Sequence, residues 1–99
     1  MLQVVRLLNE MRHQTKESAE TYKLHGNHSQ AWFFFGALDA INSMLHMTMK
    51  VNSLESLLEA LYGKLFIYKH EGYGDWQRGR VHAVKYIIEW VGNRATLNG

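Results

Sequence analysis

The absence of proline is the feature of this 99-residue sequence that most constrains its fold. Proline breaks helix interiors, so a chain without it can form long uninterrupted helices. Apolar residues recur at steps of three and four over long stretches, which is the helical period, and strand-like alternation is absent over any useful length. One such stretch, in the third of the helices expected below, has an apolar seam made of Leu54, Leu58, Leu61, Leu65 and Tyr68. The sequence therefore predicts an all-α protein.

Four helices are expected, and glycines or capping residues separate them. Ser29 and Asp75 are the candidate N-caps of the second and fourth helices, because their side chains can accept hydrogen bonds from free backbone N–H groups. The third helix is expected to follow Asn52 or Ser53, and Asn52 and Glu55 have the spacing of a capping pair. The expected helices cover about residues 2–24, 29–50, 53–71 and 75–91, which gives one domain over 1–93 and a loose tail over 94–99.

A weak internal repeat relates the two halves of the chain. Residues 22–26 resemble residues 68–72, and the surroundings of Gly36 resemble those of Gly79. Each half would then be a helical hairpin whose second helix carries Gly-x-x-x-Ala, a spacing that lets two helix backbones approach closely. Chance similarity between helical compositions is the alternative. If the repeat is real, the halves form a pseudo-symmetric four-helix bundle.

The second predicted helix is apolar around most of its circumference, apart from a narrow polar stripe that includes Asp39, Ser43 and His46. Such a helix must be buried on most sides, and three other helices in a small bundle would hardly cover it. We therefore expect self-association, or a partner protein, to cover the rest. The residues expected in this interface are Trp32, Phe33, Phe34, Phe35, Ile41, Met44 and Met47.

The segment from 71 to 80, EGYGDWQRGR, departs from local helix rules. Arg78 and Arg80 fall in the first turns of the fourth helix, where free backbone N–H groups already form a positive end. A bound anion would offset both charges, because guanidinium groups and free amides suit phosphate oxygens, and neighbouring aromatic rings can stack on a base. The segment thus predicts a site for a phosphate-bearing, nucleotide-like ligand. Its candidate residues are Tyr73, Trp76, Arg78, Arg80, His82 and Lys85.

A simpler interpretation of the same segment is structural. Glu71 and Asp75 would pair with the two arginines, Trp76 would pack in the core, and Gly79 would permit a helix crossing.

A third interpretation is nucleic-acid binding. Gln77, Arg78, His82 and Lys85 lie along one side of the fourth helix and would form a recognition helix in the major groove. The net charge of +2 is low for such a protein, and Glu89 ends the stripe. A solvated charged face is the more common meaning of such a stripe.

Several chemical classes are excluded. The chain has no cysteine, so disulfides, thiolate zinc sites and cysteine nucleophiles are ruled out. His25 and His28 would supply only two metal ligands, and we expect no metal. Nucleophile-elbow, P-loop, dinucleotide and His-Glu-x-x-His motifs are missing, so we expect no enzyme and no cofactor. Without a signal peptide, and with an apolar run (31–35) far below the roughly 20 residues of a membrane span, a cytoplasmic location is expected.

The end of the sequence has the pattern Gly-Arg80-x-x-Ala83-x-x-x-Ile87-Ile88-x-Trp90. With this pattern, its length and its lack of cysteine, the chain resembles small helical accessory proteins of bacteriophages and prophages over about its last third. The resemblance implies a role in host takeover or in blunting host defence, by masking a host protein or sequestering a nucleotide signal. We therefore expect an oligomeric, non-enzymatic binding protein that inhibits or sequesters a host protein or a small anionic ligand. The alternative is a small nucleic-acid-binding regulator.

Overall fold

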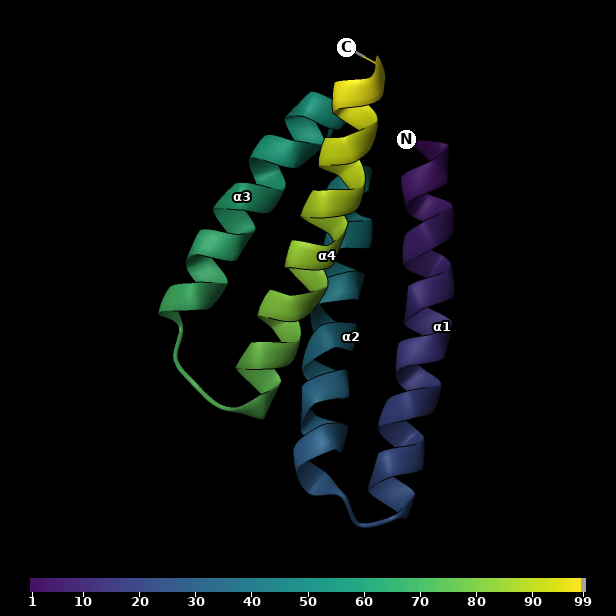
Figure 1. Cartoon of the computed structure of the whole chain (residues 1–99), viewed down its shortest axis with the longest axis vertical. Helices are drawn as coiled ribbons and strands as arrows, with labels where there is room; N and C mark the ends of the chain where they lie inside the picture. Colours follow the sequence, from purple (N-terminus) through teal and green to yellow (C-terminus); the bar gives the residue numbers. More distant parts are fainter. Residues whose placement is uncertain (99) are drawn as a thin grey trace.

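The computed structural model describes the backbone of residues 1–98 and the side chains of residues 1–94. Four helices make up this part of the chain, and it contains no strand (Figure 1). The predicted all-α four-helix bundle is confirmed. The helices are α1 (Leu2–Leu24), α2 (His28–Thr48), α3 (Leu54–His70) and α4 (Asp75–Asn98).

The structure shows which side chains cap the first turns of α2 and α3. The side chain of Asn27, not Ser29, caps α2, and its Oδ1 accepts a hydrogen bond from Gln30 N at 3.2 Å. At the start of α3 the cap is Ser53, one of the two residues predicted to precede this helix, and its Oγ accepts a hydrogen bond from Ser56 N at 3.1 Å. Both caps satisfy a backbone donor that has no partner within the helix.

The fourth helix is longer than predicted. The sequence places its end at Val91 because Gly92 and Asn93 commonly follow a helix, but the helix continues to Asn98. One glycine costs a helix interior only about 1 kcal/mol, a penalty that favourable packing on neighbouring turns offsets. Val91 supplies such packing, since it is fully buried. The predicted tail therefore begins within α4, and its last residue, 99, lies outside the described part of the chain.

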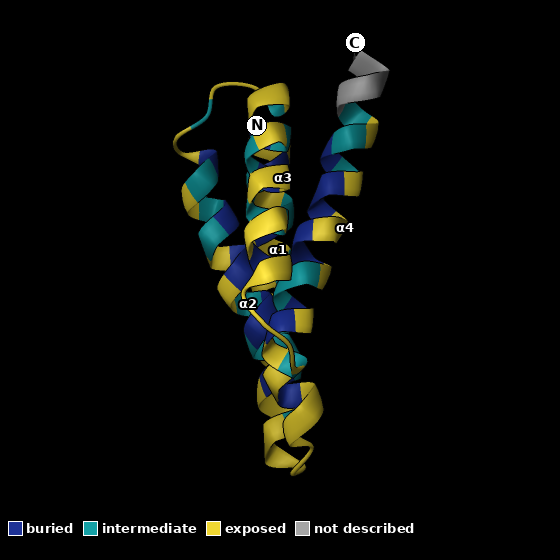
Figure 2. Ribbon diagram, turned by 90° about the vertical axis from the view of Figure 1, so that its left-hand side faces the viewer, coloured by how far each residue is buried: buried dark blue, intermediate teal, exposed yellow. Residues whose placement is uncertain are grey.

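The helices form two antiparallel hairpins, α1–α2 and α3–α4 (Figure 1). The hairpins pack through their second helices, so that α2 lies mainly against α4 and α1, while α3 lies mainly against α4. One end of the α1–α2 hairpin extends beyond the turn of α3–α4, which gives an elongated molecule of 46 × 27 × 22 Å (Figures 1 and 2).

The two hairpins meet at a pair of glycines. A Cβ atom built on Gly36 would lie 2.0 Å from the carbonyl oxygen of Trp76, and one on Gly79 would lie 1.8 Å from that of Phe33. Each glycine thus faces the residue three positions before the other glycine. This reciprocal contact is what a local twofold relation between the hairpins requires, and it supports the internal repeat. The predicted close approach of two helix backbones is found at this crossing.

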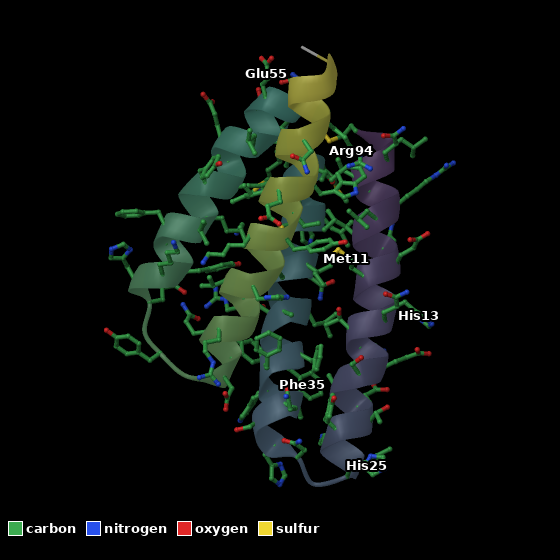
Figure 3. The ribbon with its side chains drawn as sticks, in the orientation of Figure 1. Met11, His13, His25, Phe35, Glu55 and Arg94 are labelled. Carbon is green, nitrogen blue, oxygen red and sulfur yellow. The ribbon has the colours of Figure 1, made fainter. Side chains whose placement is uncertain are left out.

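The first helix packs one face against the bundle and exposes the other. Val4, Leu8 and Ala19 are buried against the rest of the bundle. Figure 3 shows Met11 pointing from α1 into the space between the helices, while His13 points away from it. The residues that point outward form the solvent-exposed face of α1. On this face His13 Nε2 lies 3.2 Å from Glu17 Oε1.

The second helix is covered far better than its composition suggested, because it packs against both α1 and α4 (Figure 1). Ile41 and Met44, expected in an interface between copies, are fully buried in the core of a single chain. They are therefore unavailable to a partner, which corrects that expectation. The remaining predicted interface residues are half-buried (Phe33, Phe34, Phe35, Met47) or 56% exposed (Trp32). The composition of α2 alone therefore does not require a second copy.

None of the helices, over the residues described, combines the length and the apolar character needed to cross a membrane.

Candidate functional site

The loop between α3 and α4 begins the candidate ligand site. Gly72 and Gly74 have φ angles of 133° and 109°, which L side chains rarely adopt, so the loop needs glycine at both positions. Tyr73 stands between them and is fully exposed. The loop therefore presents a free aromatic ring next to the start of α4.

A groove of about 520 Å³ lies beside this loop. Its walls come from the end of α3, the loop, the first three turns of α4, and one residue of α2. Four predicted ligand residues line it: Tyr73, Arg78, His82 and Lys85. The other lining residues are Phe33, Tyr68, Lys69, Gly72, Gly74, Gln77 and Val81, which the prediction did not include.

The groove is positively charged. Arg78, Lys85 and Lys69 contribute cations, His82 adds an imidazole, and no carboxylate is among the lining side chains. Arg78, His82 and Lys85 are spaced by four and three residues, so they lie along one side of α4. Arg78 is 70% exposed and forms an ion pair with Asp75 at the edge of the groove. A ligand anion there would compete with this carboxylate.

The two arginines do not form the predicted clamp. Residues two apart on an α-helix point in nearly opposite directions, because each residue turns the helix by about 100°. Arg80 therefore points into the bundle, and its side chain is only 18% exposed. Its Nη1 donates hydrogen bonds to Glu71 Oε2 at 2.8 Å and to Gln77 Oε1 at 3.0 Å.

Arg80 also reaches α2 and α3. Its Nε lies 3.3 Å from Asp39 Oδ2 in an ion pair, and its guanidinium lies 3.8 Å from the centre of the Tyr68 ring. Burial lowers the pKa of Arg80, but the hydrogen bonds and charges of Tyr68 and Glu71 outweigh this effect and raise the pKa overall. Arg80 thus connects three helices and is not available to a ligand in the groove.

Trp76 also lies outside the groove. Its ring packs edge-on against Trp32 with centroids 5.4 Å apart, and it remains 37% exposed. The predicted stacking position of Trp76 is therefore corrected, and Tyr73 is the aromatic residue at the groove. The structural interpretation is right about the Glu71 and Asp75 ion pairs and the crossing at Gly79, and wrong in placing Trp76 in the core.

Gln77 cannot act as a base-reading residue in this conformation. It is 7% exposed, and its Nε2 donates to the backbone oxygen of Tyr68. The proposed recognition face of α4 therefore keeps only Arg78, His82 and Lys85, all of which are exposed.

The polar stripe of α2 is explained by contacts between helices. Asp39 pairs with Arg80, and Ser43 Oγ accepts a hydrogen bond from Lys64 Nζ at 2.6 Å. Asp39 and Ser43 thus have their partners on other helices, α4 and α3.

Metal ligands do not gather in the described residues. His25 Nδ1 lies 2.8 Å from the backbone oxygen of Thr21, whereas His28 lines a pocket that does not include His25. In the part of the chain that the structure describes, no three His, Asp or Glu side chains lie together so that they could hold a metal ion.

No family model matches this chain, and comparison with curated proteins and with solved structures gives no match either.

Proposed function

We propose that this protein is a non-enzymatic binding protein whose groove between the end of α3 and the start of α4 captures a phosphate-bearing, nucleotide-like ligand. One observation carries the proposal. Tyr73, Arg78, His82 and Lys85, selected from the sequence for this chemistry, line a single groove together with Lys69, which adds a further cation.

The lining suits both halves of such a ligand. Val81 and Phe33 provide an apolar wall, and Tyr73 is free to stack on a base. The guanidinium of Arg78 and the ammonium of Lys85 suit phosphate oxygens, with which they form charge-assisted hydrogen bonds. The groove volume falls within the range of about 300–1,000 Å³ that is usual for small-molecule sites.

Isothermal titration calorimetry tests this proposal by measuring the affinity of the protein for nucleotides. The ligands are nucleoside monophosphates, triphosphates and cyclic nucleotides, with inorganic phosphate and free nucleosides as partial ligands. Lys85→Ala and Arg78→Ala should each weaken nucleotide binding several-fold, since one exposed charge contact contributes up to about 1 kcal/mol. Lys16→Ala is the matched control, because Lys16 is an exposed lysine on α1 outside the groove.

Substitution of Asp75 should change nucleotide affinity in the opposite direction. Its carboxylate pairs with Arg78 and would repel a ligand phosphate, so Asp75→Asn should strengthen nucleotide binding. Silence across the whole panel, or binding that Arg78→Ala and Lys85→Ala leave unchanged, would refute the proposal.

Nucleic-acid binding is the second candidate, and the exposed stripe of Arg78, His82 and Lys85 favours it. It predicts an affinity for duplex DNA that falls steeply with salt, because phosphate contacts release counterions. A single nucleotide occupying the groove gives a much weaker salt dependence. Titration of both ligands at two salt concentrations therefore separates the two functions.

The biological consequence that we propose is sequestration. A protein of this kind acts stoichiometrically, by withdrawing a nucleotide signal or by masking a host protein, which is the role that the resemblance to bacteriophage accessory proteins implies. Self-association remains part of this proposal, and its remaining basis is the exposed end of α2 around Trp32. Sedimentation equilibrium of the full chain at micromolar concentration measures it.

A further inference from the structure

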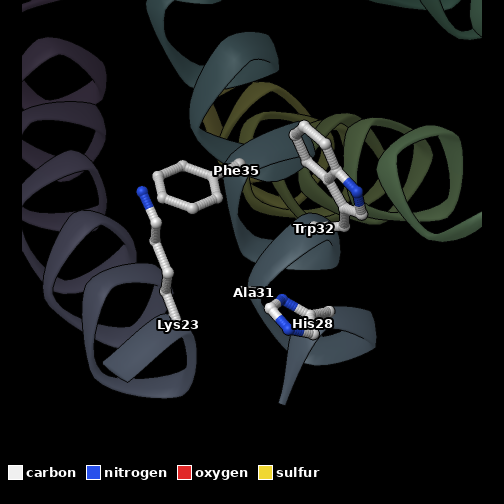
Figure 4. Close-up of a pocket in the computed structure, with 5 residues that line it drawn as sticks. All are labelled: Lys23, His28, Ala31, Trp32 and Phe35. Atoms are coloured by element: carbon white, nitrogen blue, oxygen red, sulfur yellow. The ribbon is translucent and has the colours of Figure 1, made fainter. Parts of the chain in front are cut away.

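A second pocket lies on the α1–α2 hairpin, toward the end where its two helices are joined (Figure 4). It has a volume of about 410 Å³ and shares no lining residue with the groove described above. Lys23 of α1 and His28, Ala31, Trp32 and Phe35 of α2 line it.

Most of this pocket is apolar, and its aromatic side is held in place from behind. The Trp32 ring packs edge-on against both Phe35, at 6.3 Å between centroids, and Trp76, at 5.4 Å. Ala31 is 4% exposed and leaves room between the larger side chains. Trp32 nevertheless remains 56% exposed, so its indole offers a large and preorganised apolar surface to a ligand.

The only groups in the lining that can carry charge are basic. Figure 4 shows Lys23 reaching from α1 toward Phe35, with His28 on the α2 side of the pocket. Neither side chain forms a hydrogen bond, ion pair or ring contact with another described residue, and no carboxylate lines the pocket. An ammonium beside an apolar surface favours a ligand that brings an anionic group to it, because a charge-assisted hydrogen bond then forms next to buried apolar area.

We propose that this pocket binds an apolar monocarboxylate, of the class of medium-chain fatty acids. The hydrocarbon chain packs against Trp32, Phe35 and Ala31. The carboxylate accepts a hydrogen bond from Lys23 Nζ. This site shares no residue with the nucleotide groove, so ligand binding at either place can fail without the other, whereas a dimer formed through Trp32 would compete with it.

Titration of the full-length protein with decanoate, below the concentration at which it forms micelles, tests the proposal by calorimetry and by tryptophan fluorescence. Decanoate should bind with one site per chain, whereas acetate, which lacks the chain, and decylammonium, which reverses the charge, should bind at least tenfold more weakly. Trp32→Ala should abolish decanoate binding.

Charge reversal at the pocket gives the decisive comparison. Lys23→Glu should lower decanoate affinity at least tenfold and raise that of decylammonium, and Lys23→Gln should lie between the two. Lys16→Glu, two turns earlier on the same helix and outside the pocket, should bind decanoate as the unmodified chain does. Lys23 is exposed, so circular dichroism should show all three variants folded.

Three results would overturn the proposal. The first is equal affinity for decanoate and decylammonium, which would indicate an apolar surface that does not discriminate between ligand charges. The second is decanoate binding that Lys23→Glu leaves unchanged. The third is a stable dimer in sedimentation experiments that covers Trp32 and excludes decanoate, which would make a second copy of the chain the true occupant.

Discussion

Gly36 of α2 and Gly79 of α4 lie against each other's helices, each facing the carbonyl oxygen of the residue three positions before its counterpart. The contact sets how closely the two hairpins approach. It also sets the rotation of α4, because Gly79 must face α2. With Gly79 turned inward, Arg78 on one side faces the groove and Arg80 on the other faces the bundle. One crossing thus positions the candidate site.

Alanine at either crossing glycine should destabilise the protein. In an ordinary helix interior Gly→Ala stabilises by up to about 1 kcal/mol, but here the new Cβ would lie 1.8–2.0 Å from a backbone oxygen. Backbone cannot give way as a side chain tip can, so we expect Gly36→Ala and Gly79→Ala each to cost about 2 kcal/mol or more in urea unfolding. Gly63→Ala is the control. A Cβ at Gly63 in α3 meets nothing within 4 Å, and this variant should be more stable than the original.

The two arginines should differ strongly in their effect on stability. Arg80→Ala removes two hydrogen bonds, an ion pair and the stacking on Tyr68, and we expect a cost of about 1–3 kcal/mol, limited by the partial exposure of Asp39 and Glu71. Arg78→Ala removes one surface ion pair and should cost less than about 0.5 kcal/mol. Arg80→Lys should recover little, because an ammonium lacks the planar fork that meets these partners together.

The contribution of Arg80 to the free energy of unfolding should not change with pH near neutrality, because Arg80 does not titrate there. The folded pKa of Arg80 is raised above its unfolded value, which itself lies far above neutral pH, so the stabilisation is fully present below the unfolded pKa and is lost only as the pH rises through the folded pKa. The difference between the original chain and Arg80→Ala, measured by urea unfolding at pH 7 and pH 9, should therefore stay constant. A difference that shrinks by half over this range would contradict the assignment.

The cap of α2 can be located by mutation. Asn27→Ala removes the acceptor for Gln30 N–H and should lower the unfolding free energy by about 1 kcal/mol. Ser29→Ala removes only an exposed hydrogen bond to Asp75 Oδ2 and should have a smaller effect. Thermal unfolding of the two variants distinguishes them, and a larger loss for Ser29→Ala would restore Ser29 as the cap.

Local pattern was sufficient to predict what depends on neighbouring residues in the chain. The lack of proline and the 3.6-residue period yield four helices, with the bounds of the first reproduced at Leu2 and Leu24. The Gly-x-x-x-Ala spacing identified the crossing before any packing was known. The choice between Asn27 and Ser29 was not decidable in this way, because both are good caps and lie in the same turn.

Properties that depend on packing between distant parts of the chain could not be predicted from the sequence. The inward direction of Arg80 follows from the rotation of α4, which its contact with α2 determines. Lys69 and Phe33 belong to the groove although they come from α3 and α2, and no local signal joins them to residues 73–85. The coverage of α2 likewise required the knowledge that it lies between α1 and α4, not at the edge.

The seam of α3 provides a last test, since the structure assigns a different residue to the core. The sequence placed Leu58 in the seam, but Leu57 is 1% exposed and Leu58 only half-buried. Leu57→Ala should therefore cost about 2–5 kcal/mol, as expected for a fully buried leucine whose removal leaves a cavity. Leu58→Ala should cost clearly less, because solvent already reaches part of its side chain. Urea unfolding of the two variants measures the difference directly, and equal losses would mean that α3 is rotated about its axis relative to this packing.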